Sequence, residues 1–246
     1  MIVALIADVH ANLLALEACL AAARTAGADH LVFLGDLVGY GAEPEEVVAR
    51  VSGLAEAGAI VIRGNHDEAA LRPLPGMNPV AQQAIEWTRG RLSGAAKSFL
   101  DALPLAHESD GILYVHADAT APARWIYVTD AETARGSIEA TAARVTFCGH
   151  VHVPRLYCRV AAGQIVQHTP RTEMEIPLSN SLRWLAVIGS AGQPRDGNPA
   201  AAFALYHPQR RSLTYCRAAY DVEAAAAGVR RAGLPEALAM RLLAGS

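Results

Sequence analysis

Short apolar runs alternate with longer runs of helical character through the first two-thirds of the chain. Strands are predicted for MIVALIAD, HLVFLGD, AIVIRG, ILYVHA and RVTFCGH. Helices are predicted for residues 12–27, 44–58 and most of 79–103, whereas strands dominate from about residue 155 until two helices from about residue 221. No Ser- or Gly-rich linker separates these parts. We therefore expect one α/β (α+β) domain over residues 1–246, with a β-rich core and helices outside it.

The predicted strands of the first part end in side chains that can bind a metal ion. They are Asp8, His10, Asp36, Asn65, His66, His116, His150 and His152. The carboxyl ends of strands in open α/β sheets converge on one crevice, so we expect these residues to lie together. Two Asp, one Asn and several His suit Mn, Fe, Zn or Co better than calcium or structural zinc. The set is too large for one ion.

Two of these segments contain pairs with one residue between them. Strand side chains alternate with period two, so Asp8–His10 and His150–His152 are each predicted to share a face of an extended segment and to hold one ion. Asp36 stands alone on its strand and is the candidate to bridge two ions about 3.5 to 4 Å apart. Each motif alone also fits a capped turn or a surface pair, but five motifs in this order favour a site.

Composition argues against several other classes of protein. The formal net charge is -3, without the basic excess of a nucleic-acid-binding protein, so nucleic acid is not an expected partner. No apolar stretch reaches about 18 uncharged residues, and the N-terminal run is interrupted by Asp8, so we expect a cytoplasmic protein with no membrane partner. Reduced, buried thiols are expected at Cys19, Cys148, Cys158 and Cys216. Structural or solvated roles are expected for His30, His107, His168 and His207.

Five segments resemble, in order, the motif blocks of the calcineurin-like metallophosphoesterases. They are ADVHAN, GDLVGYG, GNHD, YVHA and CGHVHVP, and they span residues 8–154. The stretch GSAGQPRDGNPAAAFALYH resembles the small bacterial and archaeal phosphodiesterase-like branch and extends the likeness to about residue 207. The resemblance implies a four-layer sandwich of two mixed β-sheets flanked by helices.

The resemblance also implies a site for two divalent metal ions. Carried over motif by motif, it assigns Asp8, His10 and His152 to one ion, Asn65, His116 and His150 to the other, and Asp36 to both. Manganese is our first choice among Mn, Fe, Zn, Co and Ni. His66 is left free of metal as the candidate catalytic residue, placed to protonate the leaving oxygen. We expect Gly64 to permit a tight turn and Asp67 to fix the loop.

The predicted function is hydrolysis of small phosphodiesters or nucleotides by a metal-bridging hydroxide. The alternatives are a metal-dependent nuclease, a phosphomonoesterase or protein phosphatase, and an inactive binding protein. Protein serine/threonine phosphatases of this superfamily carry Asp and Arg where this chain has Gly39 and Tyr40, which argues against phosphopeptide substrates. Two divalent ions outweigh two aspartates and a hydroxide by about one charge, which suits a singly charged diester.

Two further positions are predicted to contact the substrate. Arg195 is the candidate cation, with Arg124 as its alternative, and Tyr40 is the candidate to stack on a nucleoside or aryl group. The sequence leaves the physiological substrate and the oligomeric state open.

Overall fold

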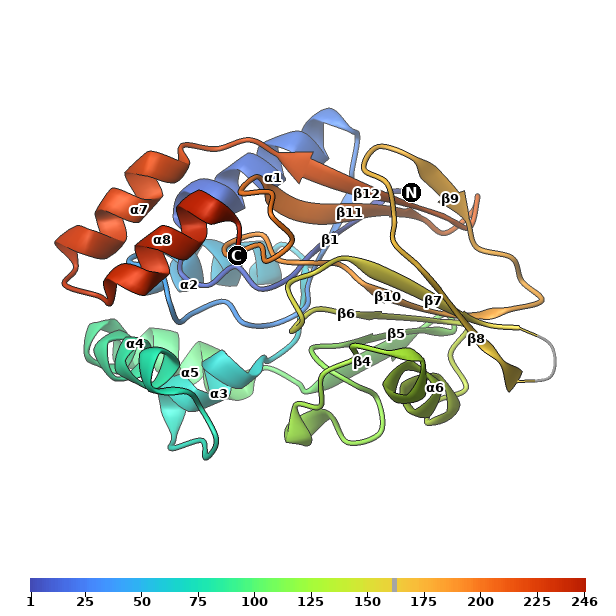
Figure 1. The fold of residues 1–246 in the computed structure, drawn as a ribbon, viewed down its shortest axis with the longest axis horizontal. Coiled ribbons are helices and arrows are strands. Elements are labelled where there is room, and N and C mark those ends of the chain that lie inside the picture. Colours follow the sequence, from blue (N-terminus) through green and yellow to red (C-terminus); the bar gives the residue numbers. More distant parts are fainter. Residues whose placement is uncertain (161–162) are drawn as a thin grey trace.

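The computed structural model describes residues 1–160 and 163–246 (Figure 1). Within these residues two six-stranded sheets pack face to face. The first sheet has the strand order β3 (Ile60–Val61), β2 (His30–Phe33), β1 (Val3–Ile6), β11 (Ala201–His207), β12 (Ser212–Ala218) and β9 (Glu175–Pro177). The second has the order β4 (Ala106–Ser109), β5 (Ile112–Val115), β6 (Val145–Cys148), β10 (Arg183–Val187), β7 (Arg155–Arg159) and β8 (Ile165–His168).

Both sheets are mixed, and each contains three neighbouring parallel strands. These are β1, β2 and β3 in the first sheet and β5, β6 and β10 in the second. All the other pairings are antiparallel, including β1 with β11 and β10 with β7. The N-terminus lies at the end of β1 that is remote from the C-terminal helices, so β1 runs toward the helical side of the molecule (Figure 1).

The helices complete the layers. They are α1 (Leu13–Thr25), α2 (Pro44–Glu56), α3 (Asn65–Leu71), α4 (Pro79–Arg91), α5 (Gly94–Ala102), α6 (Ala131–Glu139), α7 (Val222–Arg231) and α8 (Glu236–Ala244), with a 3₁₀ turn, η1, at Pro122–Arg124. Leu16 of α1 and Val47 of α2 are buried with Phe33 of the first sheet, and Ile138 of α6 with Leu185 of the second. The prediction of two mixed sheets flanked by helices is confirmed.

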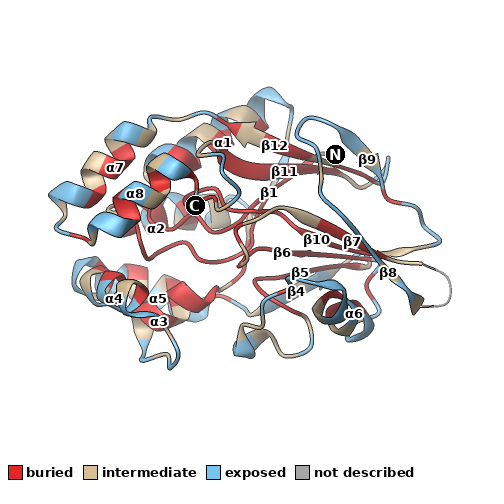
Figure 2. Ribbon diagram, in the orientation of Figure 1, coloured by how far each residue is buried: buried red, intermediate tan, exposed pale blue. Residues whose placement is uncertain are grey.

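The core between the sheets is apolar and aromatic. Leu5 and Tyr206 of the first sheet are buried with Phe147 and Trp184 of the second, and the rings of Phe147 and Tyr206 lie 5.1 Å apart. Figure 2 shows the buried residues concentrated in the strands and the exposed ones on the outer surfaces of the helices. Burial of this apolar surface is the main force that holds the two sheets together.

Several sequence predictions are corrected by the structure. Each motif-bearing strand ends before its polar residues; β1, for example, ends at Ile6. GNHD does not close a strand, because α3 begins at Asn65. Strands β4 and β9 and helix α6 were not predicted.

The four cysteines are buried and free, as expected. Among the described residues no helix is long and apolar enough to cross a membrane.

Candidate metal centre

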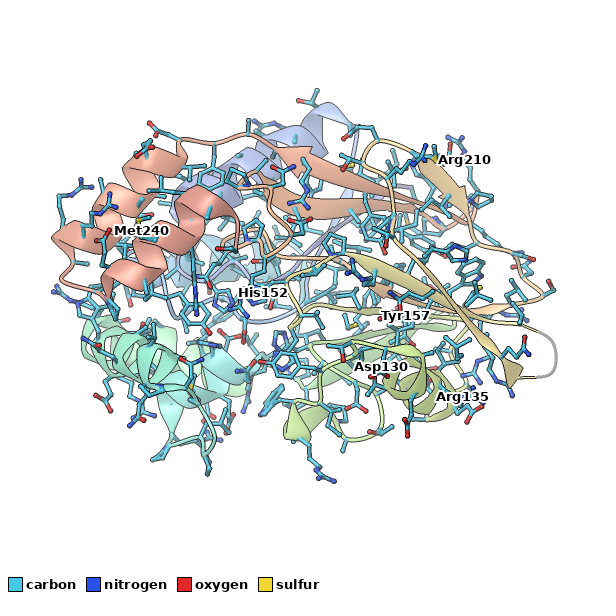
Figure 3. The ribbon with its side chains drawn as sticks, viewed as in Figure 1. Asp130, Arg135, His152, Tyr157, Arg210 and Met240 are labelled. Atoms are coloured by element: carbon cyan, nitrogen blue, oxygen red, sulfur yellow. The ribbon has the colours of Figure 1, made fainter. Side chains whose placement is uncertain are left out.

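The residues with metal-binding side chains come together where the parallel strands of the two sheets end. Asp8 and His10 follow β1, Asp36 follows β2, Asn65 and His66 open α3, His116 follows β5, and His150 and His152 follow β6. All eight are buried. In Figure 3, His152 lies at this end of the sheets, between the α7–α8 pair and helices α3 to α5. The predicted convergence is therefore present.

One group of ligand atoms is formed by Asp8, His10, Asp36 and His152, and these atoms lie within 4.8 Å of one another. The Nε2 atoms of His10 and His152 are only 3.1 Å apart. The other ring nitrogen of each faces a backbone carbonyl: His10 Nδ1 faces Val38 at 3.1 Å, and His152 Nδ1 faces Gln193 at 2.7 Å. With the proton donated to that carbonyl, each neutral ring presents a lone pair at Nε2. Two facing lone pairs repel each other unless a cation lies between them.

A second group repeats this pattern. His116 Nε2 lies 3.2 Å from His150 Nδ1 and 3.0 Å from Asn65 Oδ1. His116 Nδ1 lies 2.7 Å from the carbonyl of Leu34, and His150 Nε2 lies 3.0 Å from that of Trp125. When both rings donate to these carbonyls, two nitrogen lone pairs and an amide oxygen converge. An amide oxygen with two imidazole nitrogens is a donor set that divalent transition metals accept.

Asp36 belongs to both groups. Its Oδ2 lies 3.6 Å from His10 Nε2 and 3.4 Å from His116 Nε2. Its Oδ1 accepts a 2.7 Å hydrogen bond from the backbone N–H of His66, which fixes the carboxylate plane. One carboxylate oxygen thus faces ring nitrogens of both groups.

Asp8 connects the two strand ends that carry the paired motifs. Its carboxylate accepts from the backbone N–H of His150, with both oxygens at 3.0 Å, and Oδ1 lies 3.5 Å from His152 Nε2. Gly149 permits this approach, because a Cβ there would lie 2.5 Å from Asp8 Oδ2.

The electrostatics of the cluster favour a cation. Burial lowers the pKa of His150 to about 3, with His116 adding to the effect, and burial lowers the pKa of His10 and His152 well below the usual range. Burial also raises the pKa of Asp8 to about 8. These groups therefore gain from a partner that neutralises the carboxylates and accepts imidazole lone pairs. Divalent metal ions do both, so the residues fit the expected cofactor.

Asp36 and His116 form the exception in this cluster. Burial opposes the charge on His116, but the nearby Asp36 carboxylate raises its pKa to about 9. Burial likewise opposes ionisation of Asp36, yet His116 and His66 hold its pKa well below the usual range. Asp36 is the carboxylate that stays ionised in the interior.

The backbone of the site is unusual. Five of the candidate ligands have positive φ: Asp8 (53°), His10 (49°), Asp36 (53°), His150 (68°) and His152 (63°). Non-glycine residues seldom adopt this left-handed conformation, and its cost is tolerated mainly at functional sites. The expectation that the D-x-H and H-x-H pairs share a face of an extended strand is therefore wrong. Left-handed turns beyond the strand ends bring Asp8 and His10 into one group of ligand atoms. His150 and His152 instead belong to different groups, so the prediction that this pair holds one ion is wrong as well.

The GNHD segment is held by its carboxylate. Asp67 Oδ1 accepts from the backbone N–H groups of Leu37 at 2.9 Å and Val38 at 3.2 Å, and Oδ2 accepts from that of Gly64 at 2.9 Å. The predicted loop-fixing role of Asp67 is confirmed. Gly64 has φ -100°, so it is not needed for a left-handed turn; a Cβ there would lie 2.2 Å from the backbone N of Asp36. The glycine permits close approach of two chain segments.

His66 lies beside the two groups of ligand atoms but belongs to neither. Its ring centroid lies 4.8 Å from that of His10 and 4.4 Å from that of Tyr40. Among the described residues, no hydrogen-bond partner reaches its buried Nδ1. Burial lowers the pKa of His66 to about 4. The ring is therefore neutral near pH 7 in the protein alone.

The predicted substrate-contacting residues differ in accessibility. The guanidinium carbon of half-buried Arg195 lies 5.7 Å from the Tyr40 ring, and its Nη2 donates to Gln193 Oε1 at 3.1 Å. Tyr40 is only 6% exposed and packs with α4, α7 and α8, which leaves little surface for the stacking that we expected of it. Arg124 is exposed, at the end of η1.

Two aromatic residues next to the centre were not predicted. The Tyr127 ring stacks on His150 with centroids 3.8 Å apart and an interplanar angle of 16°. The Trp125 ring meets His116 edge-on at 5.9 Å. Both follow η1 and lie outside any predicted strand end, whereas the other site residues were predicted because they follow strands. Two aromatic residues close together in RWIYV are the one sequence feature that could have indicated them.

Comparison with known proteins agrees with this geometry. The model of the calcineurin-like phosphoesterase superfamily domain matches residues 1–211. A protein of Methanocaldococcus jannaschii is 31% identical over 253 residues, covering 99% of this chain and 98% of its own. The crystal structure of a metallophosphoesterase from Sphaerobacter thermophilus superimposes with a TM-score of 0.89 at 36% identity, covering all of both chains. A hypothetical protein from Pyrococcus horikoshii OT3 shares the fold, with a TM-score of 0.80, 19% identity and coverage of 100% of this chain and 98% of its own.

The sequence motifs, the two sheets and the buried donor groups lead to the same conclusion. The chain belongs to the calcineurin-like phosphoesterase superfamily and is a metal-dependent phosphoric ester hydrolase.

Proposed function

We propose that this protein hydrolyses small phosphodiesters or nucleotides and that it holds two divalent metal ions to do so. Asp8, His10 and His152 would hold one ion, Asn65, His116 and His150 the other, and Asp36 both. The observation that carries the proposal is Asp36 Oδ2, which faces two separate sets of converging donor atoms. When bound, two such ions supply an activated water nucleophile and neutralise phosphoryl oxygens. Manganese remains our first choice of metal.

His66 is our candidate for assisting the leaving group. It belongs to neither group of ligand atoms, and its neighbour Asn65 contributes the amide oxygen of the second group. The backbone N–H of His66 donates a hydrogen bond to the Asp36 carboxylate, which holds the backbone of His66 next to the centre. A phosphoryl group next to the ring would favour the charged imidazolium, because opposite charges attract more strongly in a buried site. His66 would then donate a hydrogen bond or a proton to the departing oxygen.

The preference for diesters follows from the few cations near the centre. Burial is the main cause of the lowered pKa of His152, and the Arg195 guanidinium lowers it further. Arg195 therefore lies close enough to interact electrostatically with groups of the centre. A phosphomonoester carries more negative charge than a diester and usually requires a bidentate arginine or further cations. Position 40, where protein phosphatases of this superfamily carry arginine, is a buried tyrosine here. A singly charged diester therefore matches the site better than a phosphopeptide.

There is space beside the centre for a second ester group. A cavity of about 640 Å³ is lined by His10, Tyr40 and Gln193 and by residues of α1, α2, α4, α7 and α8, among them Glu45 and Glu46 of α2. This volume falls in the range typical of small-molecule sites. The space supports substrates of nucleotide size.

The test is a substrate panel under each of Mn, Fe, Co, Ni, Zn and Mg. The substrates are bis-nitrophenyl phosphate, nitrophenyl phosphate, a dinucleoside polyphosphate and a phosphopeptide, compared by kcat/KM. We expect the diester to be preferred to the phosphopeptide under the best metal. A phosphopeptide that wins by about tenfold or more overturns the proposed preference, and no turnover of any ester with any metal overturns the function.

A further inference from the structure

The segment that follows η1 holds His150 on two sides. Trp125 adopts a left-handed conformation with φ 56°, and its carbonyl accepts from His150 Nε2 at 3.0 Å. Two residues later, the Tyr127 ring lies nearly parallel to the His150 ring at 3.8 Å. The chain therefore brings Tyr127 to the edge of the metal centre through backbone strain that its surroundings must offset.

Tyr127 has one covered face and substantial free surface. Stacking on His150 covers one face of its ring, yet 50% of the residue is exposed. Among the exposed large hydrophobic residues of the described chain, Tyr127 is the one aromatic ring. The uncovered part of the ring is therefore available to an aromatic group from outside the chain.

Tyr127 is placed next to the metal centre by its contact with His150, a candidate ligand of the second group. An aromatic group bound on its free surface would therefore lie beside the centre. Tyr40, in contrast, is buried.

We propose that Tyr127 is the platform on which a nucleobase or another aromatic ring of the phosphoester substrate stacks. The proposal rests on the function proposed above and narrows its substrate class to phosphoesters of nucleosides or similar aromatic alcohols. Every base has a π-face, so such stacking binds aromatic groups without selecting one base. The His150 ring supports the platform from below, and the metal-bound phosphate would set its distance from the base.

The test uses two probes that differ only in the base. Calorimetry with the manganese-loaded protein measures the Kd of adenosine 5'-monophosphate and of ribose 5-phosphate. Stacking predicts that the wild type prefers the nucleotide by about tenfold. Tyr127→Ala should abolish this preference, and Tyr127→Phe, the matched control that keeps the ring, should retain it. Metal content is measured for every variant, and Tyr127→Leu provides a second variant without a π-face.

The outcomes separate this proposal from its alternatives. A wild type that binds both probes equally or neither, or a Tyr127→Ala variant that keeps the preference, overturns it. Loss of metal and equal weakening of both probes in Tyr127→Ala and Tyr127→Leu also overturns it, because Tyr127 then only supports His150. The calorimetric comparison does not depend on turnover, so failure of the wild type to hydrolyse diesters would overturn the proposed function separately.

Discussion

The metal centre and its rim are built in different ways. We use "centre" for the seven candidate ligands, and "rim" for Arg195, Trp125 and Tyr127. The ligands of the centre are buried, and every histidine among them has its second nitrogen at a backbone carbonyl. The rim residues are half-buried or exposed and come from loops beyond η1 and β10. The centre is fixed by the core of the fold, whereas the rim is attached to it.

This difference assigns separate tasks to the two regions. Left-handed residues and close glycine contacts position the centre, and such features tolerate little change. Loops vary without disturbing a core, so the rim can select substrates while the chemistry stays the same. Changes in the centre should therefore affect all substrates, and changes at the rim should affect substrates differently. The following predictions test that division, beginning with the largest effect.

Asp36→Asn should remove both ions and reduce activity toward all esters to the level of the metal-free protein. Asparagine cannot provide the charge that balances two cations. The melting temperature of the variant in manganese should also fall, because stabilisation by bound ligand is lost. Metal analysis, activity and thermal unfolding measure these effects. The matched control is Asp130→Asn. Asp130 is the exposed N-cap of α6, and asparagine is an equally good N-cap residue. A fully loaded, active Asp36→Asn enzyme would show that the centre is not shared through this residue.

His66→Ala should keep both ions and slow turnover by about 10²- to 10⁴-fold for esters with poor leaving groups. The loss should be smaller with nitrophenolate, which leaves without a proton. Rates for a series of leaving groups, together with metal analysis, check this prediction. Equal losses across the series would argue against proton donation, and loss of metal would place His66 among the ligands.

Arg195→Ala should lower kcat/KM about tenfold, mainly through KM, and should leave metal content unchanged. Its guanidinium is the cation that we expect to contact the phosphoryl group. Arg124→Ala removes an exposed arginine of the neighbouring loop and should change little. Steady-state kinetics on both variants provides the comparison. A larger loss in Arg124→Ala than in Arg195→Ala would exchange their roles.

Asn12→Ala should have the smallest effect on catalysis. Asn12 is buried two residues after His10 and accepts from Ala15 N–H at 3.1 Å as the N-cap of α1, while its amide donates to the carbonyl of Gly192 at 3.0 Å. Losing these bonds should cost about 2 kcal/mol of unfolding free energy. Urea denaturation measures this loss, with exposed Asn180→Ala as control. If Asn12→Ala loses activity but keeps its stability, then residues close to the centre affect catalysis without binding metal or substrate, and the division between centre and rim is incomplete.

The sequence could predict the centre because its residues share one rule: each follows a parallel strand, and such ends meet. It could not predict the left-handed backbone at Asp8 or His150, since that conformation depends on contacts between distant segments. The short edge strands β4 and β9 could not be predicted, because Ala106–Ser109 and Glu175–Pro177 contain charged or small residues in place of a β-branched run. Tyr127 could not be predicted as a site residue, because it lies in a loop and loops have no periodic sequence pattern. The single-domain organisation, the choice of manganese and the cytoplasmic location stay predictions.

The central claim is that two ions lie on either side of Asp36. Crystals grown with manganese, and measured near its absorption edge, test this claim directly by anomalous diffraction. The account predicts two anomalous peaks, one among Asp8, His10 and His152 and the other among Asn65, His116 and His150, both within bonding distance of Asp36. A single peak, or peaks away from these residues, in crystals of protein that is active with manganese would contradict it.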